Sequence, residues 1–257
     1  MNYREALNKF IDDMNYLKND EVEGIVFYGS YHTGTNNEFS DIDLMILFND
    51  DSDINQIKGY KTVNGIPVEY FERTISKVYE RANSDYMKCE DSLLSIIGYG
   101  EVIFDRSGKV QDLVEYVKEK YSRPLPTYTK HEAMYQILSI KKAVDACEEL
   151  RVQNDPYFEN YYFISVERIR NFYHKLNGLS NLPQTKVCKL YTNEKLREVQ
   201  HKKIPEQEFI NLYFKAIEFG ISKEEKVSRI RDLLNYSIRK YNINFDDVRI
   251  DLGKKRY

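Results

Sequence analysis

The pattern of hydrophobic residues changes at Pro124 and Pro126, and this change limits the architectures that the chain can adopt. Before these prolines, short runs rich in β-branched and aromatic residues alternate with stretches of helical spacing, which is typical of an α/β fold. After them, nearly every stretch has helical spacing. Because prolines interrupt regular structure, we place a linker here and predict two domains, residues 1–122 and an all-helical bundle over residues 128–257.

The first domain is expected to form a small mixed sheet with helices. This fold class is α/β in the broad sense, and α+β in the narrower sense. Its expected strands are residues 22–28, 41–48, 61–63, 66–71 and 101–104, and its expected helices are residues 2–19, 74–97 and 109–121. Asn64-Gly65 between two of the strands is typical of a β-hairpin turn. In the second domain the expected helices are residues 130–151, 156–176, 206–219 and 223–241, with a break over residues 177–184.

Composition and charge narrow the class of protein. The net charge of the 257 residues is -3, whereas proteins that clamp long nucleic acids usually present a basic surface, so we expect no long nucleic acid as a partner. The polar N-terminus and the lack of a long apolar run predict no signal peptide and no membrane association. Cys89, Cys147 and Cys188 are odd in number and lack metal-ligand spacing, which favours a reducing, cytoplasmic location.

Gly29-Ser30 follows the first expected strand directly and suits a phosphate ligand. Glycine lets the backbone approach a ligand closely, because it has no Cβ. If a helix begins at this point, its free N–H groups and the positive end of its dipole favour a triphosphate. The Ser30 hydroxyl adds one more hydrogen-bond donor, so the pair is a candidate nucleotide-binding element.

Asp41 and Asp43 are two residues apart at the start of the second expected strand. Residues i and i+2 of a strand project from the same face, so both carboxylates point to one spot. Two bare carboxylates this close repel each other and raise each other's pKa. A divalent cation removes this repulsion, and magnesium prefers a few carboxylates completed by phosphate oxygens and water. The spacing therefore predicts a magnesium site.

Glu69 is the candidate for a third acid, since antiparallel or mixed pairing of its strand would place it beside Asp41 and Asp43. Three carboxylates can hold two magnesium ions, which clamp the attacking and leaving oxygens of an in-line displacement. Glu69 would instead, or also, take the proton from the attacking hydroxyl. Glu72 competes with Glu69 for this role, and a solvent-facing position on the strand is the alternative for Glu69.

The stretch that contains these residues resembles the signature of the DNA polymerase β-like nucleotidyltransferase superfamily. The matching positions are Gly29, Ser30, Gly34, Ser40, Asp41 and Asp43. With a helical bundle after it, such a domain is similar to bacterial antibiotic nucleotidyltransferases of the aminoglycoside and lincosamide type. The resemblance covers residues 22–121 and implies that the Gly-Ser element binds a nucleoside triphosphate, ATP as first choice, while the three acids bind magnesium. Two positions differ from the common pattern, because Thr33 stands for a basic residue and Glu69 for an Asp.

Four further side chains have two interpretations each. Lys186 would reach the nucleotide phosphates, or it is a solvated lysine after a turn. For His32, in the phosphate-facing segment, a plain loop histidine is the preferred interpretation. Glu167 and Arg170 share a predicted helix, and an ion pair on the helix surface is preferred over a role in the active site.

Together these features predict an enzyme in which an acceptor hydroxyl attacks the α-phosphorus of a nucleoside triphosphate and pyrophosphate is released. The low net charge and compact size favour a small-molecule hydroxyl acceptor, such as an antibiotic. The alternatives are the same transfer to a protein or tRNA acceptor, and a non-enzymatic nucleotide-binding module, which would be expected to lack one of the acids. A homodimer remains open, because related two-domain enzymes often share a cleft between subunits.

Overall fold

The computed structural model describes residues 3–54, 56–241, 243 and 245, and it divides into two compact units. The first unit comprises Met1–Leu125 and Leu182–Lys202, and the second comprises Pro126–Asn181 and Lys203–Tyr257. The two-domain division of the sequence places residues 182–202 in the helical domain, whereas the structure groups them with the first unit. Two contacts tie this segment to the first unit: a buried ion pair of Lys202 with Asp91, and stacking of His201 on Tyr99 with 3.6 Å between ring centroids.

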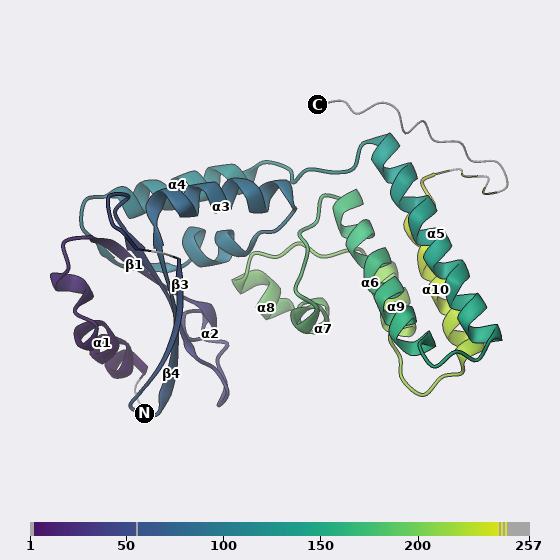
Figure 1. Ribbon diagram of the computed structural model, residues 1–257, viewed down its shortest axis with the longest axis horizontal. Helices are drawn as coiled ribbons and strands as arrows, with labels where there is room; N and C mark the ends of the chain where they lie inside the picture. Colours follow the sequence, from purple (N-terminus) through teal and green to yellow (C-terminus); the bar gives the residue numbers. More distant parts are fainter. Residues whose placement is uncertain (1–2, 55, 242, 244, 246–257) are drawn as a thin grey trace. The chain divides into compact units, whose positions relative to one another are not determined.

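The first unit is built on a mixed sheet, so the α/β fold class is confirmed. Its strands are β1 (Val22–Tyr28), β2 (Ile42–Phe48), β3 (Ile57–Val63), β4 (Ile66–Thr74) and β5 (Glu101–Asp105). Within the described residues they form one five-stranded sheet in the order β3-β4-β2-β1-β5. Figure 1 labels β1, β3 and β4 in this sheet. The pairing of β2 with β4 is parallel and the other pairings are antiparallel. The predicted hairpin at Asn64-Gly65 joins β3 to β4, with Val63 opposite Ile66.

Helices of the first unit differ from the prediction in three places, one of which is Asn15, where a φ of 55° interrupts the helix predicted over residues 2–19. The helices are α1 (Tyr3–Asp13), η1 (Tyr16–Lys18), α2 (Gly29–Thr33), α3 (Ile75–Met87), η2 (Leu94–Gly98), α4 (Lys109–Ser122), α7 (Gln184–Thr192) and α8 (Glu194–Val199). The single helix predicted over residues 74–97 is wrong, because Cys89 has a φ of 61°, which an α-helix does not accommodate. No element was predicted where α7 and α8 lie.

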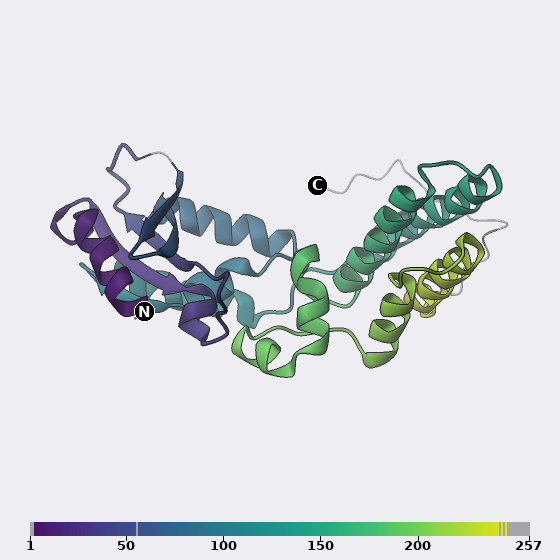
Figure 2. The same ribbon diagram turned by 90° about the horizontal axis from the view of Figure 1, so that it is seen from below.

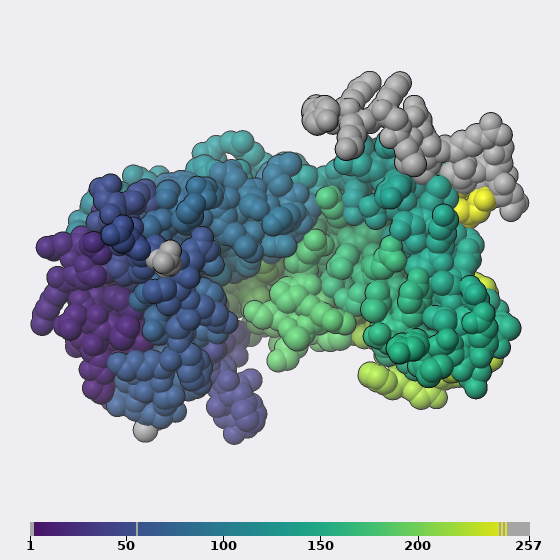
Figure 3. All heavy atoms as spheres, in the orientation of Figure 1, coloured from purple at the N-terminus to yellow at the C-terminus, as the bar shows by residue number. Residues whose placement is uncertain are grey.

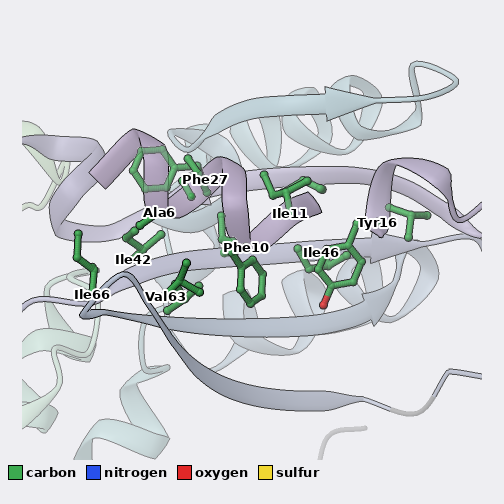
Figure 4. Close-up of a cluster of buried hydrophobic side chains, with 14 of the residues drawn as sticks. Ala6, Phe10, Ile11, Tyr16, Phe27, Ile42, Ile46, Val63 and Ile66 are labelled. Atoms are coloured by element: carbon green, nitrogen blue, oxygen red, sulfur yellow. The ribbon is translucent and has the colours of Figure 1, made fainter. Parts of the chain in front are cut away.

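The two faces of the sheet are covered by different helices, because side chains alternate along each strand. α1 packs on one face, where Phe10 meets Ile46 within a cluster of buried side chains (Figure 4). α3 and α4 cover the opposite face, where Val78 and Val114 belong to the same buried cluster as Met45. The central strands of the sheet are therefore covered on both faces, whereas most residues of the edge strand β3 are exposed.

The second unit is helical in its described part. It contains α5 (Lys130–Val152), α6 (Phe158–Leu176), α9 (Gln207–Ala216) and α10 (Lys223–Ile238), which pack against one another (Figure 2). Aromatic side chains fill its core, and Tyr173 stacks on Phe209 with ring centroids 3.8 Å apart. Among the described residues of the whole chain, no helix is both long enough and apolar enough to cross a membrane.

Candidate active site

Three carboxylates meet at one end of the sheet of the first unit. Asp41 directly precedes β2, Asp43 lies on β2, and Glu69 lies opposite Asp43 on the parallel strand β4. Each residue contributes a carboxylate oxygen to a group in which these atoms lie within 4.8 Å of one another. All three residues are partly exposed, so a ligand can reach them from solvent.

The surroundings of Asp43 disfavour its charged form. Burial, followed by the charges of Asp41 and Glu69, raises the pKa of Asp43 to about 7, although Lys186 and Lys58 act in the opposite direction. A carboxyl group with a raised pKa beside two other acids is a place where a positive ion is strongly favoured. Oxygen ligands at this spacing fit a hard divalent cation such as Mg²⁺, which the acids would hold together with phosphate oxygens.

Gly29 stands where β1 ends and α2 begins, and two observations explain why glycine is needed there. Its φ is 78°, in the left-handed region that side chains rarely adopt. A Cβ at this position would also collide with the carboxylate of Asp43. The backbone of the Gly29-Ser30 element therefore lies directly against the acidic group, and the helix start that the sequence only allowed for is present as α2.

Thr33, which replaces a basic residue of the common pattern, closes the short helix α2. Its hydroxyl donates to the carbonyl of Gly29 at 3.1 Å, and it is 2.9 Å from the hydroxyl of Thr35. His32, in the same helix, donates from Nε2 to the carbonyl of Tyr99 at 2.9 Å. Both side chains therefore hold the backbone around Gly29-Ser30 in place, in keeping with the structural interpretation of His32.

The segment between α2 and β2, residues 34–41, projects from the surface of the first unit and leads into the acidic group (Figure 3). The hydroxyl of Ser40 accepts a hydrogen bond from the backbone N–H of Asn37 at 2.9 Å, and the side-chain oxygen of Asn37 accepts one from the N–H of Phe39. These hydrogen bonds of Ser40 and Asn37 stabilise the turn that precedes Asp41. Phe39, at the same turn, is 86% exposed.

Comparison with known proteins agrees with this arrangement. Residues 7–98, which include α2, the acids and the hairpin, match the family described as "Nucleotidyltransferase domain". The match covers less than half of the chain, and this part is similar to nucleotidyltransferase domains. Its motif and its acidic group fit the polymerase β-like superfamily to which the sequence was compared.

Two individual proteins are similar to this chain. A relative from Methanocaldococcus jannaschii, named "Putative protein adenylyltransferase MJ1305", is 24% identical over 139 residues, which are 52% of this chain and 93% of the relative. The solved structure of a nucleotidyltransferase-like protein from Exiguobacterium sibiricum 255-15 has a TM-score of 0.48 at 10% identity, and the match covers 93% of this chain and 75% of that one.

Glu72, the competitor for the third acidic position, has a different environment from Glu69 within the first unit. It lies three residues beyond Glu69 and therefore on the other face of β4, where it is buried. Its carboxylate accepts a hydrogen bond from the hydroxyl of Tyr16 at 2.5 Å. Glu72 is thus engaged beneath η1, and the structure groups Glu69 with Asp41 and Asp43 instead.

Two lysines stand near the acids, and the sequence pointed to one of them. Lys186 lies in the first turn of α7, within the first unit. It is close enough for its charge to act on Asp43. Lys58 on β3 was missed, although its Nζ lies 2.7 Å from Oε1 of Glu69. The hairpin register contains the signal: Tyr60 pairs with Glu69, so Lys58 is the diagonal neighbour of Glu69 on the same face.

Proposed function

We propose that this protein is a metal-dependent nucleotidyltransferase that moves a nucleoside monophosphate group, AMP from ATP as first choice, to a hydroxyl of a separate acceptor. The observation that carries the proposal is the group of Asp41, Asp43 and Glu69, whose carboxylate oxygens lie within 4.8 Å of one another. This group directly adjoins the Gly29-Ser30 element. A nucleotide-binding module without enzymatic activity would have no use for three acids at one spot.

The proposed reaction is an in-line displacement at the α-phosphorus. The acceptor oxygen forms a bond to phosphorus, the bond to the bridging oxygen breaks, and pyrophosphate leaves. Asp41 and Asp43 would hold two Mg²⁺ ions, and Glu69 would hold metal, accept the acceptor's proton, or do both. When bound, the metal neutralises the charge that builds up on the reacting oxygens.

The triphosphate would lie over the end of β1. The backbone at Gly29 and the hydroxyl of Ser30 supply hydrogen-bond donors next to the acids, where the β- and γ-phosphates belong. Lys186 would contribute a positive charge from α7, since it already acts electrostatically on Asp43. In this arrangement Gly29, Ser30 and Lys186 would contact the phosphates of the nucleotide, and the acceptor would approach from the side of β4.

A small-molecule hydroxyl compound, such as an antibiotic, is the first candidate acceptor, because the net charge of -3 does not favour a long nucleic acid. A protein hydroxyl is the second candidate, and the name of the Methanocaldococcus jannaschii relative, a protein adenylyltransferase, supports it. A tRNA end remains a third acceptor of the same chemistry. In each case we propose a cytoplasmic enzyme without a membrane partner, with homodimer formation left to measurement.

The test is pyrophosphate release from each of the four nucleoside triphosphates with and without Mg²⁺. The acceptors are a panel of aminoglycosides and lincosamides, and a cell extract in which α-labelled nucleotide reports transfer to protein or RNA. We expect Mg²⁺-dependent release with one nucleotide and one acceptor class. The same release from a variant with Asp41→Asn and Asp43→Asn would rule out the metal assignment. Nucleotide binding with the same affinity in the presence and absence of Mg²⁺ would contradict it as well.

A further inference from the structure

A cavity of about 200 Å³ lies in the first unit between the sheet and α3. Its floor includes Met45 of β2 and Phe71 of β4, which are each two residues beyond an acid, Asp43 and Glu69 respectively. Residues two apart on a strand share a face and are separated by about 7 Å. The cavity therefore begins one side-chain position away from the acidic group, on the same face of the sheet.

The size of this cavity limits what it can hold. Pockets for whole drug-sized ligands occupy roughly 300–1,000 Å³, so a cavity of about 200 Å³ suits one ring or one short side chain. Phe71, Val78, Leu93 and Ile96 give it apolar walls. A flat or compact apolar group fits these walls, whereas a complete nucleotide does not.

Two guanidinium groups line the cavity, and their partners differ. Arg81 on α3 is 2.6 Å from Asp85, whose side chain is 1% exposed, so its charge is balanced. Arg73 on β4 donates to the neutral side-chain oxygen of Gln56 at 2.9 Å. Among the described residues, no carboxylate forms an ion pair with Arg73. Burial, followed by the charge of Arg81, lowers the pKa of Arg73, whereas the charge of Asp85, which also lines the cavity, acts in the opposite direction.

Extending the proposed function, on which this step rests, we propose that the cavity binds the part of the acceptor next to its reacting hydroxyl, and that this part is a carboxylate on a flat or apolar body. Arg73 supplies paired N–H donors that match the two oxygens of a carboxylate. The strand that carries Arg73 also carries Glu69, the candidate base for the acceptor hydroxyl. A polycationic aminoglycoside would instead bring like charge to two guanidinium groups, which disfavours it as acceptor.

Binding of three probes of one shape tests the charge preference: benzoate, benzamide and benzylamine, observed by ligand-detected NMR with the full chain. We expect benzoate to bind, benzylamine not to bind, and Arg73→Gln to weaken benzoate binding about tenfold. Arg123→Gln, on the exposed end of α4, is the matched control and should leave benzoate binding unchanged. Equal binding of benzoate and benzylamine, or an unchanged affinity in folded Arg73→Gln, would overturn the proposal.

Two further measurements separate this proposal from the proposed function. Asp41→Asn should lose Mg²⁺-dependent transfer but keep benzoate binding. The role of the acidic group and the role of the cavity are therefore tested independently. Arg73→Lys keeps the charge but loses the paired donors, and it should also weaken benzoate binding if Arg73→Gln does not fold. Displacement of benzoate by ATP without Mg²⁺ would assign the cavity to the nucleotide base and overturn the acceptor role.

Kinetics with labelled ATP identify the source of the carboxylate. Hydroxy acids of low molecular weight form one arm, and protein from a cell extract forms the other. In the arm that is labelled, Arg73→Gln should raise the KM for the acceptor about tenfold and leave the KM for ATP unchanged. Efficient labelling of an aminoglycoside that does not depend on Arg73 would contradict the proposal.

Discussion

The acidic group of the first unit and Glu167 of the second unit lie in opposite surroundings. In the first unit, Asp41, Asp43 and Glu69 are gathered at one spot with their like charges together. In the second unit, Glu167 on α6 faces opposite charge, since Nε and Nη2 of Arg170 donate to its Oε2 at 3.1 and 2.7 Å. The hydroxyl of Tyr213 donates to the other carboxylate oxygen at 2.7 Å. The predicted pairing of Glu167 with Arg170 is present, but Arg170 is 2% exposed and not on the surface.

The same contrast appears in the pKa values of Asp43 in the first unit and Glu206 in the second unit. Burial and neighbouring acids raise the pKa of Asp43 to about 7. In the second unit burial acts on Glu206 in the same direction, but hydrogen bonds from Tyr173 and Arg239 outweigh it and lower the pKa of Glu206 to about 2. Glu206 is thus a paired acid that stabilises the fold, whereas the like charges of Asp41, Asp43 and Glu69 reduce stability in the absence of a cation. The difference distinguishes a site for a ligand from a structural contact.

Removal of the acids in the first unit should have the largest effect, and on activity alone. Asp41→Asn with Asp43→Asn is expected to reduce Mg²⁺-dependent pyrophosphate release about 10⁴-fold, because the acids would act as a unit. The melting temperature should stay the same or rise, since like charges are removed. Asp51→Asn with Asp53→Asn, in the turn after β2, is the control for charge alone. Strong destabilisation by the first pair would contradict a purely functional role.

The paired acid of the second unit should behave in the reverse manner. Glu167→Gln leaves the buried guanidinium of Arg170 without its partner and is expected to lower the free energy of unfolding by about 3 kcal/mol. Denaturant titration measures this loss, and pyrophosphate release at low temperature should be unchanged. Glu148→Gln, which breaks a more exposed, partly buried pair with Arg151, should cost less. Equal losses in the two variants would remove the distinction between buried and exposed pairs.

Asp43 and Glu206 should contribute to the pH dependence of stability with opposite signs. Between about pH 4 and pH 7, folded Asp43 keeps a proton that the unfolded chain has released, so stability falls as the pH rises through 7. Folded Glu206 has released a proton that the unfolded chain keeps, so its stabilisation is present above pH 4.5 and is lost towards pH 2.

Melting curves in EDTA from pH 3 to pH 8 can separate these two effects. Asp43→Asn should raise the melting temperature at pH 8 relative to pH 5 by about 3 °C compared with the unsubstituted protein. Glu206→Gln should change the acidic limb alone. Mg²⁺ should flatten the neutral limb of the unsubstituted protein but not that of Asp43→Asn. Identical profiles for all three proteins would show that neither carboxyl group has a shifted pKa.

The smallest expected effect concerns Lys58, which pairs with Glu69 at the edge of the acidic group. Because its side chain is 61% exposed, Lys58→Gln should leave the melting temperature nearly unchanged. Loss of its positive charge should strengthen Mg²⁺ binding about threefold, as read from the concentration that produces half of the thermal shift. Lys77→Gln, an exposed lysine of α3, is the control, and weaker Mg²⁺ binding in Lys58→Gln would contradict this prediction.

Several parts of the active site were accessible from local sequence patterns. The apolar run before Gly29, the two-residue spacing of Asp41 and Asp43, and the Asn-Gly turn before Glu69 each depend on neighbours within a few residues. Local conformational preferences act over this range, so strands, the hairpin and the glycine at the end of the first strand follow from them. The helix predicted over residues 74–97 failed because its apolar spacing continues across Cys89, where the backbone turns.

By itself the sequence pointed to Asp41, Asp43 and Glu69 as candidate acids and to the elements on which they lie, because residue type and short-range periodicity are properties of the chain. The tertiary structure alone decided that β2 and β4 pair in parallel with Asp43 opposite Glu69, that Lys58 joins them, and that residues 182–202 belong to the first unit. It also decided that Arg73 lines a cavity beside the acids. These contacts join segments far apart in the chain, and such pairings depend on packing of the whole unit, which local patterns do not encode.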